Sequence, residues 1–173
     1  MSLCCNADAT LNPRTACPTI SIPASTQSPP AGTAGLLCLD IRDYRNIRAA
    51  SLSFTGGLNL ITGANAAGKT SLLEAVYCLG RVRSFRTSDA DRQIREGQPA
   101  FRLVGQVAVQ EGRKMPIGIE RQPGRFTIHA AGEPVRRLSD LAGNFPVHIM
   151  TADTETVLNG GPRYRRQLLD WAL

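Results

Sequence analysis

The chain has 173 residues, and its 20 Lys and Arg against 14 Asp and Glu give a formal net charge of +6. This length allows one domain, or one domain and a tail. A hydrophobic content of 42% and a charged content of 20% are ordinary for a globular domain and exclude wholesale disorder. No apolar run approaches the roughly 18 residues of a membrane-spanning helix, so no membrane partner is predicted.

Residues 1–35 differ in composition from the rest of the chain. Only Asp8 and Arg14 are charged there, and Pro, Ser, Thr, Ala and Gly dominate without a periodic apolar face. Such a segment cannot offset its ordering entropy, so it is predicted to be a disordered tail. It also lacks the basic start and apolar run of a secretory signal. The excess positive charge therefore belongs to residues 36–173, which we expect to form the folded part.

The five cysteines are an odd number: Cys4, Cys5, Cys17, Cys38 and Cys78. No CxxC pair is matched by a second pair, so neither a zinc site nor a disulfide framework is predicted. Reduced thiols in a cytoplasmic protein fit this pattern, with Cys38 and Cys78 as small buried core residues.

The first elements of the predicted fold are short strands. Residues 37–41 alternate between apolar and polar side chains, which predicts a half-buried strand, and residues 43–46 predict a turn. Residues 51–54 alternate in the same way. The apolar run at residues 58–62 predicts a third, deeply buried strand.

A helix is predicted after the Gly-rich segment that follows residue 62. Its apolar face consists of Leu72, Leu73, Val76, Tyr77 and Leu79, which recur at helical spacing. Glu74 lies off this face, and Gly80 is a natural helix end.

Strand patterns return later in the chain, at residues 101–109, 117–119, 126–128 and 147–150. Residues 110–113 and 122–124 are predicted hairpin turns. The last predicted element is a helix over residues 162–173, which Pro162 suits as a first-turn residue. His129 and His148 have no spaced ligand partners and are predicted to be structural, and Trp171 to be core or interface.

The strongest motif is GANAAGKT at residues 63–70, which fits G-x-x-x-x-G-K-[ST] between a predicted strand and a predicted helix. Glycines let such a loop curl so that backbone N–H groups point at phosphate oxygens. The N-terminus of the following helix adds partial positive charge at the same place. Lys69 can reach the outer phosphates, and Thr70 offers a hydroxyl to Mg²⁺.

Several segments together resemble the start of the RecF family of bacterial DNA replication and repair proteins. They begin with LDIRDYRNI and LSFTGGLNLITGANAAGKTSLLEAVYCLGRVRSFR, and continue through residues 87–89, 94–97, 145–147 and 158–170. This family belongs with the SMC- and Rad50-like heads of the ABC ATPase superfamily. The resemblance covers residues 36–173 and only the N-terminal portion of such a head.

The resemblance implies a fold and a set of ligands. The fold is α/β, a P-loop NTPase of the ABC/SMC-head type, with residues 36–173 as an incomplete first lobe. In that lobe a mixed sheet with an antiparallel β layer surrounds the phosphate-loop helix. The implied ligands are ATP and Mg²⁺, the ion being held through ATP by Thr70.

The resemblance also implies the residues of the site. The phosphate loop and helix start would supply Gly63, Ala64, Asn65, Ala66, Ala67, Gly68, Lys69, Thr70 and Ser71. Arg45 and Asn46 match the family's Arg-Asn step near the nucleotide, and Arg86 matches an arginine near phosphate. Asp153 falls in a loop that senses Mg²⁺ and water.

The chain departs from the family pattern at two places. The family usually has glycine where this chain has Ala66, and alanine tolerates a positive φ less well. Thr151 and Ala152 stand where a Pro-acidic pair is common.

Two parts that ABC-type heads need for hydrolysis are not found in the sequence: the signature Ser-Gly segment and an apolar strand ending in acidic residues. Without them the charge that develops in phosphoryl transfer goes unstabilised. The family is a weak DNA-dependent ATPase. The sequence leaves open whether this chain is an enzyme, and predicts ATP binding with little or no hydrolysis by the chain alone.

Arginines form three clusters: residues 81, 83, 86, 92 and 95; residues 136 and 137; and residues 163, 165 and 166. They suit a polyanion, although an Arg-rich solvated surface is an open alternative. The resemblance implies DNA as the partner, single-stranded or as gapped or linear duplex. It further implies an ATP-dependent homodimer of the complete protein, other recombination-mediator proteins, and a role in SOS-linked gap repair.

Two other functions remain open from the sequence. A small P-loop phosphotransferase, such as a nucleotide or metabolite kinase, suits the chain length. Such enzymes usually begin at the phosphate loop, however, whereas two predicted strands and a tail precede it here. A decayed or truncated product without activity is the third possibility.

Overall fold

The computed structural model describes residues 35–109, 113–135 and 137–150. Its elements are β1 (Gly35–Tyr44), β2 (Ile47–Ser53), α1 (Lys69–Arg81), the 3₁₀ turn η1 (Asp91–Gln93), β3 (Phe101–Ala108), β4 (Lys114–Gln122), β5 (Arg125–Ala130), β6 (Glu133–Pro134) and α2 (Leu138–Asn144). The predicted tail over 1–35 lies outside the described residues except for Gly35, which is the first residue of β1. Also outside them are Asp153, Trp171, the basic cluster at 163–166, the helix over 162–173 and most of the turn at 110–113.

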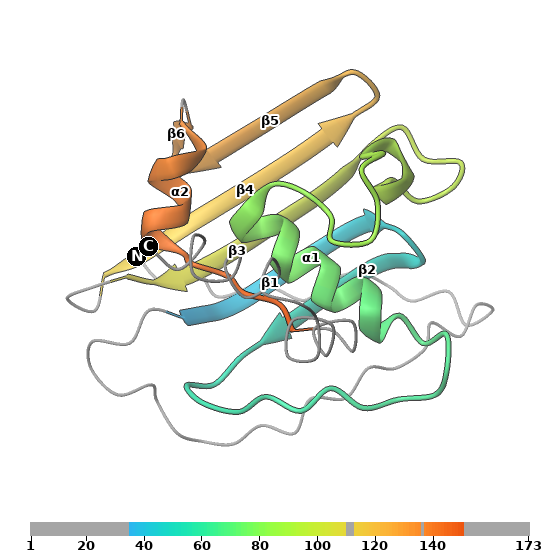
Figure 1. Ribbon diagram of the computed structural model, residues 1–173, viewed down its shortest axis with the longest axis horizontal. Helices are drawn as coiled ribbons and strands as arrows, with labels where there is room; N and C mark the ends of the chain where they lie inside the picture. Colours follow the sequence, from blue (N-terminus) through green and yellow to red (C-terminus); the bar gives the residue numbers. More distant parts are fainter. Residues whose placement is uncertain (1–34, 110–112, 136, 151–173) are drawn as a thin grey trace, which may run out of the picture.

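A single antiparallel sheet carries the fold. Its strand order is β2-β1-β3-β4-β5-β6, and each neighbouring pair among the described strands is antiparallel. Helix α1 lies across one face of this sheet, and α2 lies near the β5–β6 end (Figure 1). The predicted antiparallel layer around the phosphate-loop helix is therefore present.

The core forms between α1 and the sheet because alternate strand residues point at the helix. Those residues are Leu39 and Ile41 of β1, Phe101, Leu103 and Val107 of β3, and Ile117 and Ile119 of β4, all at most 1% exposed. Their polar strand neighbours lie on the other face, as the period-two pattern predicts. The predicted strands at 37–41, 101–109, 117–119 and 126–128 are thus confirmed.

Helix α1 buries a face that differs in part from the predicted one. Leu72, Ala75 and Leu79 are fully buried, whereas Leu73 is 47% exposed, so its assignment to the apolar face was wrong. Glu74, expected away from the apolar face, is itself 0% exposed. The helix also runs past Gly80 to Arg81, so the prediction that Gly80 ends it was wrong.

Two glycines allow the helix to pack closely. A Cβ at Gly80 would collide with Val147, and a Cβ at Gly105 of β3 would collide with a terminal methyl of Leu79. Glycine at both positions therefore sets how near α1 approaches the sheet and the segment after α2.

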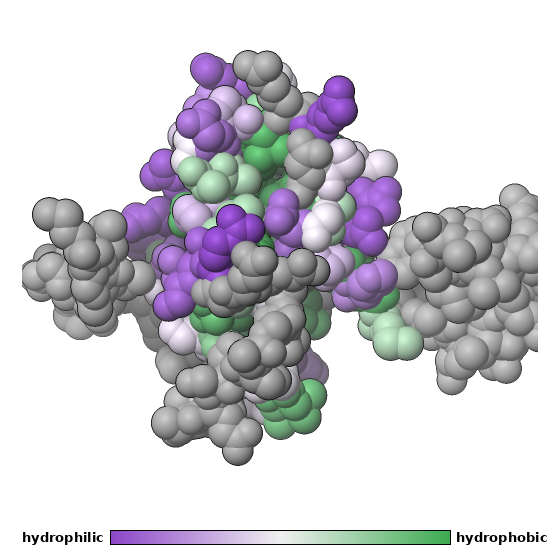
Figure 2. Space-filling view, turned by 90° about the vertical axis from the view of Figure 1, so that its left-hand side faces the viewer, coloured by the Kyte–Doolittle hydropathy of each residue, from purple (hydrophilic) through white to green (hydrophobic). Residues whose placement is uncertain are grey.

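Two predicted strands are not formed. Residues 58–62 and 147–150 have no strand assignment, and Leu58, Leu60 and Met150 are 91%, 61% and 87% exposed. A strand exists only when its N–H and C=O groups pair with a neighbour, and no described strand pairs with either segment. On the face shown in Figure 2, hydrophobic residues likewise reach the surface between hydrophilic ones.

The cysteine prediction is confirmed for one of the two described thiols. Cys78 on α1 is 1% exposed, whereas Cys38 on β1 is half-buried. Within the described ranges, no helix has the length and hydrophobicity to cross a membrane. The same ranges hold no group of three or more His, Cys, Asp and Glu residues suited to a metal.

Candidate phosphate-binding site

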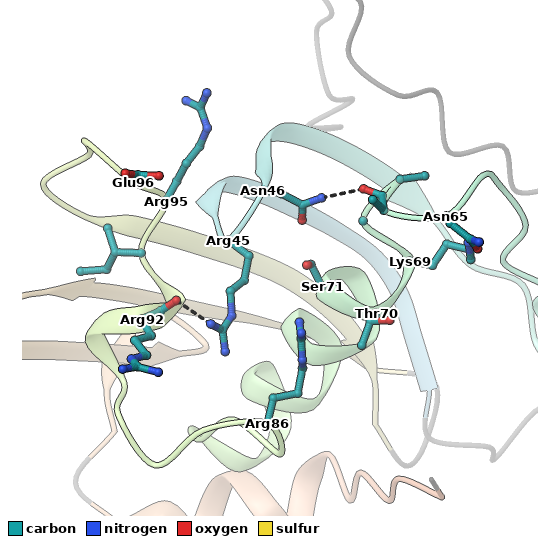
Figure 3. Close-up of a pocket in the computed structure, with 14 residues that line it drawn as sticks. Arg45, Asn46, Asn65, Lys69, Thr70, Ser71, Arg86, Arg92, Arg95 and Glu96 are labelled. Carbon is teal, nitrogen blue, oxygen red and sulfur yellow. Dashed lines mark hydrogen bonds between the residues drawn. The ribbon is translucent and has the colours of Figure 1, made fainter. Parts of the chain in front are cut away.

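The phosphate-loop motif lines a cavity of about 1040 Å³ at the start of α1. Four segments contribute to it: the β1–β2 turn, residues 65–71, Arg86, and residues 92–96. In Figure 3, the side chains of Arg45 and Arg86 lie next to each other, and Thr70 and Ser71 lie on the right of them. The structure thus brings together most of the predicted site, including Arg45, Asn46 and residues 65–71.

The loop adopts the curled backbone that phosphate binding needs. Gly63, Ala66 and Gly68 have φ values of 152°, 63° and 99°, in the left-handed region. Ala66, which stands where the family pattern has glycine, therefore has the positive φ that glycine adopts more readily. Its backbone oxygen accepts a hydrogen bond of 3.1 Å from Nδ2 of Asn46, which helps to hold this unfavourable conformation.

Gly68 is required at the helix start for a second reason besides its φ. A Cβ there would lie 3.3 Å from Nδ2 of Asn46, closer than side chains normally pack. The β1–β2 turn therefore lies directly against the loop. Asn46 bonds to the loop at Ala66 and lies beside it at Gly68.

Lys69 folds back over its own loop. Its Nζ donates hydrogen bonds of 2.9 Å and 2.8 Å to the backbone oxygens of Gly63 and Ala64. Those two residues support the lysine rather than line the cavity. Within the described residues no side chain caps the start of α1, and its first turn has no acidic residue. The helix therefore presents its N–H groups and positive dipole end to the cavity.

Arg45 is held by a buried carboxylate. Its Nε and Nη2 donate hydrogen bonds of 3.0 Å and 2.6 Å to the two carboxylate oxygens of Glu74, and its Nη1 donates one of 2.7 Å to the backbone oxygen of Arg92. These bonds to Glu74 raise the pKa of Arg45 above its ordinary value. Arg45 is thus a fixed cation at the cavity wall.

The segment after α1 is bound to the same carboxylate. The hydroxyl of Ser84 donates a short hydrogen bond to Glu74, and Nη1 of Arg86 lies 3.6 Å from it. Ser84 in turn accepts hydrogen bonds from the backbone N–H groups of Arg86 and Thr87. The segment therefore has a defined path that leads Arg86 to the cavity.

Residues 92–96 reach the cavity because they are attached to the β1–β2 turn. The N–H of Arg45 donates to the backbone oxygen of Gln93, and the N–H of Arg95 donates to that of Asp43, both at 2.8 Å. Tyr44 is buried and donates from its hydroxyl to Oε1 of Gln93 at 3.1 Å.

Sequence reasoning missed four residues near the cavity: Glu74, Arg92, Arg95 and Glu96. The sequence did offer a signal for the last three, because they lie within a basic cluster or within the segment at 94–97 that resembles the family. That predicted cluster is divided by the structure. Arg86, Arg92 and Arg95 line the cavity, whereas Arg81 donates to the backbone oxygen of Val147 at 3.1 Å. Arg83 lines other surfaces.

Comparison with known families defines the class of the chain. A family model described as an AAA domain matches residues 38–136, more than half of the chain. The chain belongs to this AAA-domain family.

Among curated proteins the relatives are DNA replication and repair proteins named RecF. The one from Edwardsiella ictaluri is 42% identical over 134 residues, which is 77% of this chain and 37% of that protein. The one from Nitrosococcus oceani is 43% identical over 135 residues, 78% of this chain and 37% of that protein. The chain thus spans somewhat more than a third of the length of these relatives.

Solved structures agree with this relationship. A structure of the recombination mediator protein RecF with ATP, in the RecFOR pathway, matches with a TM-score of 0.70 and 28% identity, over 80% of this chain and 39% of that one. The corresponding RecF–ATPrS structure matches with a TM-score of 0.71 over 83% of this chain and 38% of that one. The resemblance to the N-terminal portion of RecF and the ABC/SMC-head fold class are confirmed.

Proposed function

We propose that this chain is the ATP-binding first lobe of a RecF-like DNA repair protein. One observation carries the proposal: the curled loop, the open helix start and four arginines converge on one cavity of about 1040 Å³. A triphosphate is the ligand class that such a concentration of backbone donors and cations suits.

The residues present fit ATP. Backbone N–H groups of residues 65–70 would hold the phosphates, and Lys69 would exchange its bonds to Gly63 and Ala64 for phosphate oxygens. Thr70 would contribute its hydroxyl to an accompanying Mg²⁺, and Arg86 would face the phosphates from the opposite wall. ATP would supply a polyanion that neutralises these cations. Asp153 completes the proposed site from outside the described residues.

DNA is the proposed macromolecular partner, single-stranded or as gapped or linear duplex. The complete protein would dimerise when ATP binds and would act in recombinational, SOS-linked gap repair with other mediator proteins, in the cytoplasm. The solved relatives are described as recombination mediators of the RecFOR pathway, which supports this proposal.

Little or no hydrolysis is proposed for the chain alone. Among the described residues that line the cavity, Glu96 is the one carboxylate. The phosphotransferase alternative is not favoured, because antiparallel strands precede and follow the phosphate loop and the fold matches a RecF structure with a TM-score of 0.70.

Binding of ATP is tested by titrating the purified chain with a fluorescent ATP analogue and Mg²⁺, with Lys69→Ala as the variant. We expect saturable binding that falls at least tenfold in Lys69→Ala, because a charge-assisted phosphate contact is lost. Lys114→Ala, on β4, is the matched control. Equal affinity in wild type and Lys69→Ala would contradict the proposal.

DNA binding is tested separately by measuring the dissociation constant for gapped duplex across a series of salt concentrations. Phosphate contacts make the affinity fall steeply with salt, because bound counterions are released. An affinity that does not change with salt would count against DNA as the partner.

A further inference from the structure

Glu74 is the one fully buried carboxylate among the described residues. A buried charge is costly unless it is paired and hydrogen-bonded, so its surroundings are informative. Arg45 satisfies both carboxylate oxygens, and Ser84 adds a further hydrogen bond. No buried side-chain polar atom in the described part lacks a partner. Glu74 thus joins three segments: the β1–β2 turn, α1, and residues 84–86.

The charges around Glu74 do not balance. Its one negative charge meets two guanidinium groups, from Arg45 and Arg86. Arg45 forms the close bidentate pair, and its side chain is only 18% exposed. Arg86 lies farther away, at 3.6 Å, and its side chain is 47% exposed. Arg45 therefore neutralises the carboxylate, and the charge of Arg86 remains available to a ligand in the cavity.

Ser84 connects the carboxylate of Glu74 to the backbone of Arg86 through hydrogen bonds. Its hydroxyl donates to Glu74 and accepts from the N–H of Arg86 at 2.9 Å and of Thr87 at 3.1 Å. The backbone at Arg86 is thus tied to a buried, immobile group. Nearby, Tyr77 and Phe85 pack edge to face at 5.6 Å, which fixes the other side of the segment.

We propose that Glu74 is a positioning residue of the nucleotide site: through Ser84 it holds residues 84–86 so that Arg86 points at the phosphates bound by the loop. This inference rests on the proposed binding of ATP. Glu74 itself does not contact the nucleotide, because its side chain is fully buried and does not line the cavity. Arg45 keeps a second hydrogen bond, from Nη1 to the backbone oxygen of Arg92, so we assign the effect of Glu74 on ATP affinity to the segment that carries Arg86.

A double-mutant cycle tests this role, with the dissociation constant for the fluorescent ATP analogue and Mg²⁺ as readout. Glu74→Gln and Arg86→Ala are each expected to weaken binding about tenfold, the size of a charge-assisted contact. In the Arg86→Ala background, Glu74→Gln should weaken binding less than twofold further. A purely structural role would give the full tenfold loss in both backgrounds, and this additivity would overturn the proposal.

A second variant covers the case in which Glu74→Gln does not fold. Ser84→Ala removes the connection while leaving the Arg45–Glu74 pair intact, so the fold should persist by circular dichroism. It should weaken ATP binding severalfold in the wild-type background and not in Arg86→Ala. Arg83→Ala is the matched control, since this exposed arginine does not line the cavity. Unchanged affinity in folded Ser84→Ala would overturn the proposal.

Different results would contradict the proposed binding of ATP and the proposed role of Glu74. If wild type binds no ATP, or if Lys69→Ala binds as wild type does, the proposed function is wrong and the role of Glu74 falls with it. If wild type binds and Lys69→Ala does not, but the Glu74 and Arg86 variants act additively, only the positioning role is wrong.

Discussion

The two sides of α1 differ in how well the sequence pattern is satisfied. On the sheet side, alternating strand residues are buried to 1% exposure or less and meet the helix directly. On the phosphate-loop side, Leu58 and Leu60 carry the same kind of pattern but are mostly exposed. The difference shows that an apolar alternation produces a strand only where a neighbouring strand completes it.

The largest effect is expected when a large apolar side chain is truncated to alanine on each side of α1. Phe101→Ala should lower the free energy of unfolding by about 3–5 kcal/mol, because a fully buried ring leaves a cavity. Leu58→Ala should change it by less than about 0.5 kcal/mol. Denaturant unfolding followed by circular dichroism measures both. A large loss in Leu58→Ala would show that residues 58–62 pack more tightly than described.

The buried thiol of Cys78 provides a second test of the packing between α1 and the sheet. Burial raises the pKa of Cys78 from 9.0 to about 12, so the folded state retains a proton that the unfolded state loses. This contribution to stability is complete below pH 9 and is lost as the pH rises toward 12. The loss is about 1.4 kcal/mol per pH unit within that window.

The measurement is the free energy of unfolding at a series of pH values from 8 to about 11. Cys78→Ala should show a shallower alkaline decline than wild type. The half-buried Cys38 provides the control, and Cys38→Ala should keep the full slope. Tyr44 adds to the decline in all three proteins, because burial raises its pKa too. Identical slopes in the two cysteine variants would contradict the prediction.

The smallest expected effect concerns the contact between hairpin and loop. Asn46→Ala removes the hydrogen bond to the Ala66 oxygen, worth about 0.5–1.5 kcal/mol. ATP affinity should fall about three- to tenfold, as titration with the fluorescent analogue would show. Asn59→Ala is the matched control, because the bonds of Asn59 to described residues stay within its own turn, at Thr55 and Gly57. Equal losses in both variants would argue against a specific role of Asn46.

Much of the sheet was predictable, and the reason is local. Residues 37–41 and 101–109 alternate with period two, and the strands that they form, β1 and β3, pair with each other. The alternation in the sequence therefore agrees with the burial of these residues in the sheet. Residues 58–62 and 147–150 carry equally apolar patterns without a described partner, and their predictions as strands were wrong. Short α2 was missed because seven residues give too little periodicity.

The lining of the candidate cavity was predictable where the sequence carries a motif. The loop at residues 63–70 and the step at Arg45 and Asn46 follow from sequence pattern and resemblance. Glu74 could not be found in this way, because a glutamate on an amphipathic helix is by default a solvated residue. Its burial depends on Arg45, which is 29 residues away in the sequence. Such a pairing is visible only once the fold brings the two elements together.

The glycine at position 105 allows close packing of the helix that follows the phosphate loop. Leu79, which rests against it, and Lys69 occupy opposite ends of α1, about 15 Å apart at 1.5 Å per residue. At Leu79, the helix thus packs directly against the backbone of β3. A side chain at residue 105 would require Leu79 to shift, so the close packing of the helix that starts at Lys69 depends on a residue with no side chain.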